Sequence, residues 1–357
     1  MRFLFDIGHP AHVHYFRIVA NKLQKEGHSV LFTLRNKDIA EDLLIKYNFE
    51  YVKLGKSRKG LINKILWVIK FTVRIIKVIR KFKPDLLISF YSPYLAYAST
   101  ICRIPSLGFA DTEHAIFNIK TTYPFTSLSL TPSCFRINLG EKHLRFDSYM
   151  ELSYLHKNKF TPDKSILSRL NITNNENYVL LRLVSWDAHH DIGKSGISDV
   201  FKRQLIEMLQ EKFTIFISSE KELPEDLEQF RLKTNPTEIH NVLSFASAFI
   251  SESGTMASES AILGTPVLYM NELPLMGYLE EAQKNGLLFH ITKEKDILEF
   301  IENKLLANFS KDVFIEAKNK HISNKIDLSE FMYWFFVNYP SSFDILRENP
   351  NYQYNFK

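Results

Sequence analysis

The stretch from Phe249 to Met270, FISESGTMASESAILGTPVLYM, constrains the fold more than any other part of this sequence. It contains an apolar strand that ends near Ile250, an SESGT turn, a helix of small residues, a Gly-Thr-Pro turn and a second apolar strand. A unit of this kind places the amide end of a helix at the carboxyl edge of a sheet, where the partial positive charge of the helix dipole favours a phosphate.

We therefore expect this turn to bind a diphosphate. A carboxylate one turn into the helix is within reach of a ribose. The predicted nucleotide-binding residues of this segment are Ser253, Gly254, Thr255, Met256 and Glu259.

Strands and helices alternate along the remainder of the chain. In the first half, strands are expected at residues 2–7, 29–34, 51–54, 86–90, 106–109 and 127–130, and in the second half at 178–183, 213–218, 248–250 and 267–270. Alternation of this kind indicates doubly wound parallel sheets. We expect an α/β protein with two Rossmann-like domains facing each other across a cleft, and a C-terminal helix that crosses back to the first domain. The predicted ranges are 1–155, 165–325 and, for the tail, 326–357.

Composition excludes several classes of protein. Hydrophobic residues make up 45% and charged residues 24% of the 357 positions, as in a globular protein. The two cysteines and the absence of CxxC indicate a reducing compartment, and the chain begins with a strand rather than a signal peptide, so we expect a cytoplasmic protein. Neither GxxxxGK[ST] nor GxGxxG is present, which disfavours ATPases and dinucleotide enzymes.

A run of basic residues is the second strong feature. Eleven lysines and arginines lie between Lys53 and Lys83, and no acidic residue lies between Glu50 and Asp85. The apolar residues among them predict a helix at 61–82 with a basic face, and cations recur too often for a spanning helix. Such a helix suits the surface of an anionic membrane, although a core helix with a solvated basic edge has the same pattern. The predicted membrane residues are Lys64, Trp67, Lys70, Arg74, Lys77 and Lys81. No nucleic-acid module accompanies the charge, so we expect no nucleic-acid partner.

Three histidines follow the first strand, in the sequence DIGHPAHVHYFR. His9, His12 and His14 lie at or beyond the carboxyl end of this strand, where ligands bind in such sheets. His14 or His12 is a candidate general base for an acceptor hydroxyl, because imidazole titrates near neutral pH, and His9 is a candidate substrate contact. Hydrogen bonds at the start of a helix would explain the same residues.

A second polar cluster, FADTEHA, follows the strand at 106–109. Asp111 and Glu113 could transfer protons or orient sugar hydroxyls, with His114 as a substrate contact. A helix cap is the alternative.

A third cluster, LLRLVSWDAHHDIG, follows the first strand of the second half. Arg182 could neutralise a diphosphate and Trp186 could stack on a base, with His189 and His190 as further substrate contacts. We expect no metal site, because adjacent strand residues point in opposite directions and no third ligand follows from the spacing. Ser218 and Glu220, at the end of another strand, are candidate donor contacts.

These motifs, together with LLISFYSPYLA, TPSCF and FISSEKELP, resemble domain-of-unknown-function family 354 over nearly the whole chain. The resemblance implies the GT-B fold, shared by non-hydrolysing UDP-N-acetylglucosamine 2-epimerases and many glycosyltransferases.

Within this resemblance, the Gly254 turn with Glu259 is similar to the nucleotide-binding segment of the epimerases. Glu113 resembles the glutamate of their VEAGLR motif, and His189 or His190 the histidine of HRREN. Residues 89–92 read SFYS where the epimerases carry an aspartate, which disfavours 2-epimerisation. The His-rich first turn resembles the position of a catalytic histidine in several inverting GT-B transferases.

We therefore predict an inverting, metal-independent glycosyltransferase that uses a UDP-sugar in assembly of cell-envelope or surface polysaccharide. Its acceptor is expected to be a saccharide or a lipid-linked molecule, reached at the inner face of the cytoplasmic membrane. No cofactor is expected, because the nucleotide sugar is a substrate. The alternatives are a nucleotide-sugar epimerase or hydrolase, and a protein that binds nucleotide without turnover.

Overall fold

The computed structural model describes residues 1–35, 38–55, 61–173, 176–184, 197–219, 222–307 and 310–357, except for the side chains of residues 38 and 61–66. The chain divides into two compact units. Unit 1 comprises Met1–Phe160 and Lys325–Lys357, and unit 2 comprises Thr161–Asn324.

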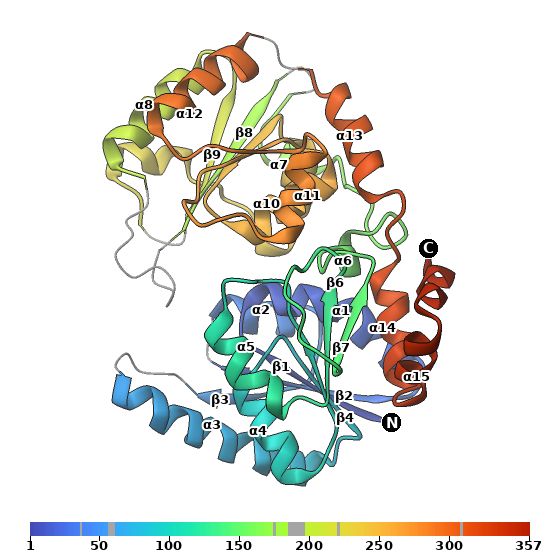
Figure 1. Cartoon of the computed structure of the whole chain (residues 1–357). Helices are drawn as coiled ribbons and strands as arrows, with labels where there is room; N and C mark the ends of the chain where they lie inside the picture. Colours follow the sequence, from blue (N-terminus) through green and yellow to red (C-terminus); the bar gives the residue numbers. More distant parts are fainter. Residues whose placement is uncertain (36–37, 56–60, 174–175, 185–196, 220–221, 308–309) are drawn as a thin grey trace. The chain divides into compact units, whose positions relative to one another are not determined.

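Unit 1 is built on a seven-stranded sheet with the strand order β3-β2-β1-β4-β5-β6-β7, in which every pairing is parallel. Its strands are β1 (Arg2–Ile7), β2 (Ser29–Arg35), β3 (Tyr51–Gly55), β4 (Leu86–Ser89), β5 (Ser106–Phe109), β6 (Leu128–Pro132) and β7 (His143–Phe146). The central strands are apolar on both sides because helices cover both faces of the sheet (Figure 1). The order reverses between β1 and β4, and ligands bind at such a switch point, beyond the carboxyl ends of the strands.

The helices of unit 1 form two layers (Figure 1). One layer contains α1 (Pro10–Lys25), α2 (Asp38–Lys46), α6 (Leu152–Leu155) and α14 (Leu328–Val337). The other contains α3 (Leu61–Phe82), α4 (Pro93–Cys102), α5 (Ile116–Thr122) and the short 3-10 helix η1 (Tyr123–Phe125). The predicted basic helix at 61–82 is therefore present as α3.

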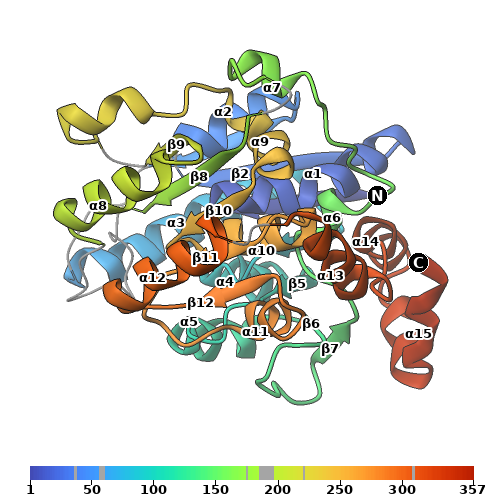
Figure 2. The same cartoon turned by 90° about the horizontal axis from the view of Figure 1, so that it is seen from above.

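The C-terminal segment belongs to unit 1, as predicted. Helix α14 packs against α1 and lies beside it in both views (Figures 1 and 2), followed by α15 (Ser341–Glu348) and the 3-10 helix η5 (Pro350–Phe356). Asp327 caps α14 by accepting hydrogen bonds from the backbone N–H groups of Ser329 and Glu330. One C-terminal helix was expected in this tail, and α15 was not predicted.

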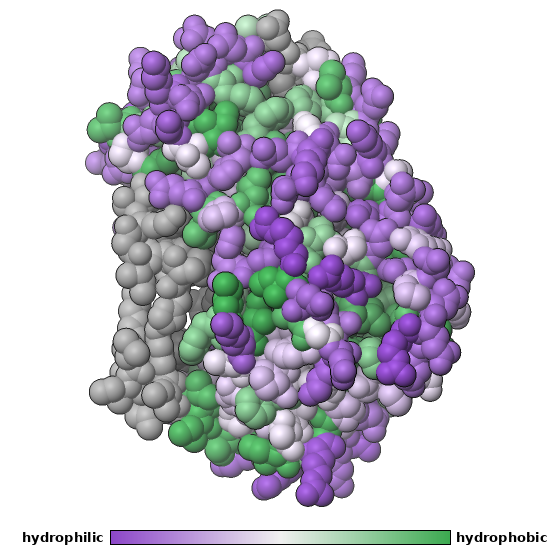
Figure 3. All heavy atoms as spheres, in the orientation of Figure 1, coloured by the Kyte–Doolittle hydropathy of each residue, from purple (hydrophilic) through white to green (hydrophobic). Residues whose placement is uncertain are grey.

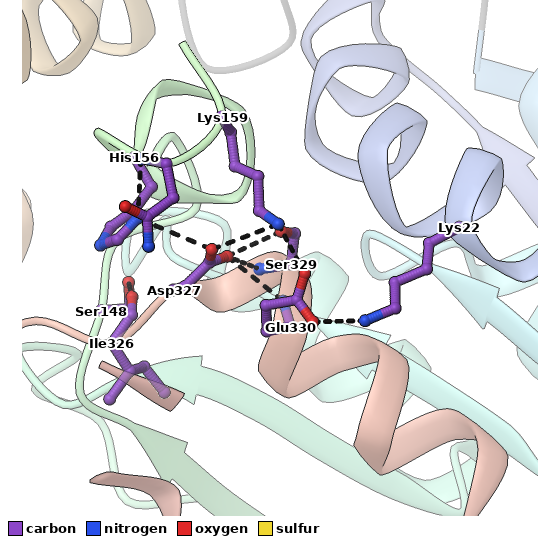
Figure 4. A network of polar contacts seen from close by, with 9 residues as sticks. Lys22, Ser148, His156, Lys159, Ile326, Asp327, Ser329 and Glu330 are labelled. Carbon is purple, nitrogen blue, oxygen red and sulfur yellow. Dashed lines mark hydrogen bonds and ion pairs between the residues drawn. The ribbon is translucent and has the colours of Figure 1, made fainter. Parts of the chain in front are cut away.

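Ion pairs fasten this tail to the rest of unit 1 (Figure 4). Glu330 forms ion pairs with Lys22 on α1 and with Lys159. Oδ2 of Asp327 lies 3.4 Å from Nζ of Lys159 and 3.6 Å from Nδ1 of His156. Because the Asp327 side chain is almost fully buried, these contacts together with the helix cap compensate its desolvation.

Unit 2 contains a five-stranded parallel sheet with the order β12-β11-β10-β8-β9. Its strands are β8 (Tyr178–Leu183), β9 (Thr214–Ser219), β10 (Ala248–Ser251), β11 (Val267–Tyr269) and β12 (Leu288–His290). The described helices are α7 (Ile166–Arg169), α8 (Asp199–Gln210), α9 (Ile239–Phe245), α10 (Gly254–Leu263), α11 (Gly277–Lys284), α12 (Glu294–Phe300) and α13 (Asp312–Ile322), with a π-helix (Ile301–Leu306) and short 3-10 turns (Glu225–Phe230 and Pro236–Glu238).

The core of unit 2 lies between the sheet and the layer formed by α8, α12 and the π-helix. On the other face, α10 packs against α9, α11 and α13. The two parallel sheets confirm the predicted α/β class. Three features were not predicted: the strands β7 and β12 and the interruption of the helix at 294–306 by a π-helical turn.

Candidate functional site

The turn between β10 and α10 has the geometry expected of an anion site. Ser253 is the N-cap of α10, and its Oγ accepts a hydrogen bond from the Met256 N–H at 3.5 Å. The first helical hydrogen bond runs from the Ala257 N–H to the Ser253 carbonyl at 3.0 Å. The amides of Gly254 and Thr255 precede this bond and therefore have no partner within the helix. The turn is part-exposed, so a diphosphate could accept hydrogen bonds from these amides.

Glu259 lies one turn into α10 and is buried, with 4% of its surface exposed. Its Oε1 lies 3.0 Å from Nε2 of His240, a buried residue of α9. Since a carboxylate only accepts hydrogen bonds, this contact assigns the ring proton to His240 Nε2. The histidine holds the carboxylate in place beneath the turn, and sequence analysis did not single it out.

Gly254 lies in close packing at the start of α10. A Cβ at this position would lie 2.9 Å from Cε of Met276, 3.3 Å from the Tyr278 hydroxyl and 3.5 Å from the Tyr269 hydroxyl. The hydroxyl groups of Tyr278 and Tyr269 thus lie close to Gly254, the first residue of the helix. Burial, with a smaller contribution from the Glu252 carboxylate, raises the pKa of Tyr269, so this hydroxyl keeps its proton.

Glu252 organises the backbone behind the turn. Its carboxylate accepts hydrogen bonds from the N–H groups of Val184 at 3.4 Å and Ile197 at 3.2 Å. Its own carbonyl accepts a hydrogen bond from the Asn271 side chain at 3.0 Å. Because the side chain is buried and faces backbone amides, its role is structural, although the SESGT motif alone does not separate it from a ligand-binding carboxylate.

Arg182 and Ser218 are adjacent at the carboxyl ends of β8 and β9. The Arg182 Nη1 donates a hydrogen bond to the Ser218 Oγ at 2.7 Å, and Arg182 also pairs in register with Ser251 of β10. A guanidinium therefore lies at the same sheet edge as the α10 turn. The predicted contacts Trp186, His189, His190 and Glu220 lie outside the described residues.

In unit 1, two histidines lie at the start of α1, and backbone hydrogen bonds set their tautomers. The Ala11 N–H donates to Nδ1 of His9 and the Gly8 N–H donates to Nδ1 of His12, both at 3.2 Å. A ring nitrogen that accepts a backbone hydrogen bond carries no proton, so the proton of each neutral ring is on Nε2. Each Nε2 is then a hydrogen-bond donor. This arrangement does not suit the predicted role of His12 as a base.

His14 lies farther along α1 and is buried. Its ring centroid is 5.4 Å from that of Tyr154 and 6.2 Å from that of Tyr47, and the Arg17 guanidinium lies 5.1 Å from the Tyr47 ring. The structure thus places His14 in an aromatic cluster with Tyr154 and Tyr47.

Arg35, at the end of β2, lies over Gly8. A Cβ on Gly8 would come within 2.1 Å of Nη2 of Arg35 and 3.6 Å of Cε1 of His12, so the absence of a side chain allows the two groups to converge. The same guanidinium lies 5.0 Å from the Tyr94 ring centroid. The structure adds Arg35 to the candidate site; its position at a strand end is the only sequence signal for it.

Asp111 and Glu113 follow β5, and both are buried. The Thr112 hydroxyl donates to Asp111 Oδ1 at 2.7 Å, whereas Glu113 Oε1 accepts from the backbone N–H of Arg136 at 3.3 Å. Burial, helped by the charge of Glu113, raises the pKa of Asp111 to about 7. Asp111 therefore exchanges a proton near neutral pH. The neighbouring His114 is half-buried.

The basic helix α3 is half packed and half exposed. Trp67 packs against the buried Phe71 at 5.2 Å between ring centroids, and Arg74 donates a hydrogen bond to the Leu54 carbonyl. Lys70, Lys77 and Lys81 are exposed, and the side chain of Lys64 lies outside the described residues. Within the described ranges, no helix combines the length and apolarity needed to cross a bilayer.

No cluster of three or more histidine, cysteine, aspartate or glutamate side chains suited to a metal ion occurs within the described part of the chain. The candidate groups in unit 2 are helix amides, one arginine and carboxylates. Those in unit 1 are ring N–H donors, an arginine and a carboxylate pair.

Comparison with known proteins places this geometry in context. The chain is similar to the uncharacterized protein MJ0665 of Methanocaldococcus jannaschii, with 25% identity over 84% of this chain and 90% of the relative. Its structure is similar to UDP-GlcNAc 2-epimerase from Neisseria meningitidis bound to UDP-GlcNAc, with a TM-score of 0.69, 15% identity and coverage of 89% of this chain and 94% of the other.

A glycosyltransferase has a similar fold as well. The spinosyn rhamnosyltransferase SpnG, complexed with spinosyn aglycone, matches with a TM-score of 0.60 and 11% identity, over 91% of this chain and 97% of the other. These similarities confirm the predicted GT-B fold. Residues 1–328 match the family described as "Protein of unknown function (DUF354)", and the chain belongs to that family.

Proposed function

We propose that this protein is an inverting, metal-independent glycosyltransferase that takes its sugar from a nucleoside diphosphate, UDP foremost. The observation that carries the proposal is the start of α10, where free helical amides lie one turn before the buried Glu259. This spacing suits a diphosphate followed by a ribose diol. The fold is shared with a protein that binds UDP-GlcNAc, which supports the choice of UDP.

In this proposal unit 2 binds the donor. The amides of Gly254 and Thr255 bind the diphosphate, and Glu259 accepts hydrogen bonds from the ribose hydroxyls. Arg182 lies at the same sheet edge, where its charge would stabilise the nucleotide as it leaves.

Unit 1 binds the acceptor in this proposal. The acceptor hydroxyl attacks the anomeric carbon, the bond from that carbon to the diphosphate oxygen breaks, and Asp111 takes the hydroxyl proton. A carboxyl group with a pKa near 7 suits this step, because about half of it is ionised at neutral pH and its carboxylate form is basic enough to take the proton. His9 and His12 donate hydrogen bonds through Nε2 and thus orient the acceptor, and Arg35 adds a positive charge beside them.

The exposed basic face of α3 suits an enzyme that works at an anionic membrane, and the proposal extends to an acceptor at the inner leaflet and a place in envelope or surface polysaccharide assembly.

The test is turnover of a nucleotide sugar. Purified protein is incubated with UDP-N-acetylglucosamine and other UDP-sugars, with and without a membrane extract from the source organism, and UDP release is measured. The proposal predicts UDP release that depends on the extract and is lost in Asp111→Asn. Tight UDP binding without release under any condition would contradict transfer and leave a protein that only binds nucleotide.

A nucleotide-sugar epimerase or hydrolase is the second candidate. It is favoured by the pairing of Asp111 and Glu113, because two carboxyl groups that share one strand end can act as acid and base on a single substrate. The absence of a carboxylate at residues 89–92 counts against it. Conversion of UDP-N-acetylglucosamine by the protein alone, followed by the NMR signals of the anomeric protons, would establish this candidate in place of the first.

A further inference from the structure

One face of unit 1 combines exposed apolar side chains with basic ones across three helices. We define the α3–α5 face as the exposed residues of α3, α4, α5 and η1, which lie together on one side of the sheet (Figure 1). Hydrophobic side chains lie at the surface in this region among hydrophilic ones (Figure 3). Its exposed large apolar residues are Ile69, Val73, Ile101, Ile116, Phe117 and Phe125.

The apolar residues of this face are unusually exposed. Phe117 has 81% of its surface accessible, and Ile101 and Ile69 have 60% and 58%. A single exposed apolar residue needs no explanation, but several on adjacent helices mark an interaction surface.

Contacts within unit 1 connect the helices that carry these residues. Ile101 and Ile104 line a groove of about 280 Å³ together with Arg80 and Lys83 of the α3 end. Next to Ile101, the Thr100 hydroxyl donates to the Phe125 carbonyl at 3.4 Å.

Further contacts connect η1 and α5 to α4. The Phe125 ring packs edge-on against Tyr97, with 4.9 Å between centroids, and the Tyr97 hydroxyl donates to the Thr121 carbonyl. The Thr121 hydroxyl in turn donates to the carbonyl of Phe117 at 2.8 Å. These contacts connect η1 and α5 to α4, which itself packs against α3.

The charge on this face has one sign. Residues 61–83 contain seven lysines and arginines, and residues 93–103 and 116–125 contain one each. The same three segments contain no aspartate or glutamate. The acidic residues between Asp85 and Glu141 are Asp111 and Glu113, and both are buried. A partner must therefore be anionic and must also accept apolar side chains.

We propose that the α3–α5 face docks on the surface of an anionic lipid bilayer, with the basic side chains at the phosphate groups and Phe117, Ile116 and Ile69 among the acyl chains. A bilayer offers both properties over an area as wide as three helices, whereas an acidic protein surface offers few sites for exposed aromatic side chains. Sequence analysis found the part of this surface on α3; the apolar part on α4, α5 and η1 comes from the structure.

The surface has a consequence that rests on the proposed function. Phe117 lies four residues after Glu113, so docking by α5 brings the loop of Asp111 and Glu113 to the bilayer interface. The acceptor of the proposed reaction is then an amphiphile that stays in the membrane while its polar head reaches these carboxylates.

The test is sedimentation of the full-length protein with vesicles, measured without any nucleotide. We expect binding to vesicles that contain phosphatidylglycerol, little binding to pure phosphatidylcholine, and weakening with salt. The charge variant K77E/R80E/K81E should lower the partition coefficient at least about 100-fold, since each cation near the surface contributes about fivefold. The apolar variant I116S/F117S should lower it at low and at high salt alike.

Two variants serve as controls. K25E/K293E/K295E makes the same change in net charge elsewhere on the chain, and V313S/I315S removes exposed apolar side chains of α13 in unit 2. Both should sediment like the wild type. Circular dichroism checks that all variants are folded. The thermal shift with UDP is a separate measurement, and failure of the folded wild type to bind UDP contradicts the proposed function alone.

Unchanged sedimentation of both test variants would overturn the proposal. So would light scattering that shows a dimer in the wild type and a monomer in I116S/F117S, because the face would then bind a second copy of the chain.

Discussion

Glu259→Gln is the substitution that most sharply separates ligand binding from folding at the start of α10. The wild-type carboxylate is 4% exposed and lies 3.0 Å from Nε2 of His240. Replacement by alanine would leave the buried histidine without this partner, at a cost of about 1–3 kcal/mol in stability. Glutamine keeps an oxygen that accepts the His240 hydrogen bond, so E259Q should remain folded.

The expected loss concerns the ribose. A hydrogen bond to a charged group contributes about 1.5–3 kcal/mol, and glutamine turns such a bond into a neutral one. If the carboxylate binds the ribose diol, the affinity of E259Q for UDP should be lower. Loss of the whole hydrogen bond would lower it about 10- to 150-fold, and this is the largest effect expected.

Isothermal titration calorimetry with UDP and with 2′,3′-dideoxy-UDP closes a double-mutant cycle between side chain and ligand. The wild type should prefer UDP strongly, and E259Q should lose most of that preference because the two changes remove the same interaction. Equal preference for UDP in wild type and variant would refute the assignment of Glu259 to the ribose.

Four further predictions concern other parts of the chain. Asp111→Asn should lower kcat/KM by about 10²- to 10⁴-fold, and the wild-type kcat/KM should rise with pH and level off above about 7, the pKa of this carboxyl, whereas a flat profile would contradict its role as base. Because burial raises this pKa, the native state binds the proton more tightly than the unfolded state, and wild-type stability falls as the pH rises from about 4 to about 7. At pH 8 the wild type therefore carries a buried charge that D111N lacks, and D111N should unfold at a higher temperature. A lower Tm for D111N would contradict the burial argument. Gly8→Ala should displace the Arg35 guanidinium, so G8A, Arg35→Ala and the double variant should lose similar activity, and additive losses would show that the two residues act separately. Asp327→Ala removes the cap of α14 together with a buried ion pair, and it should lower the free energy of unfolding in guanidinium by about 3–5 kcal/mol. Asp327→Asn keeps an oxygen for the cap and should lower this free energy less. Equal effects of the two substitutions would assign the whole loss to the charge.

Local pattern was sufficient to predict much of the fold. The periodic apolar and basic residues at 61–82 delimited α3, and the apolar runs at 106–109 and 178–183 delimited β5 and β8. The short strands β7 and β12 could not be predicted in this way. Strand β7 has four residues, with the polar side chains His143 and Arg145, and β12 has three, with the polar side chain His290. Runs this short do not establish a period, and their strand character depends on pairing with β6 and β11. Helix α15 was not predicted because Pro340 directly precedes it, and a proline usually marks the end of a helix.

The candidate site shows the same division. Strand ends identified Asp111, Arg182 and the α10 turn, because ligand groups gather where parallel strands end. Partners distant in sequence were not accessible to that reasoning. His240 meets Glu259 only because α9 packs on α10, and Arg35 reaches Gly8 only because β1 and β2 are neighbours. The donor tautomers of His9 and His12 depend on the path of the backbone at Gly8 and Ala11, which residue types do not specify.

The most direct test of this account is a crystal structure of the protein with UDP. We expect the diphosphate within hydrogen-bond distance of the Gly254 and Thr255 amides, and the ribose hydroxyls on Glu259. Density for UDP elsewhere on the chain, or an empty α10 turn in crystals soaked at a UDP concentration that saturates binding in solution, would contradict it.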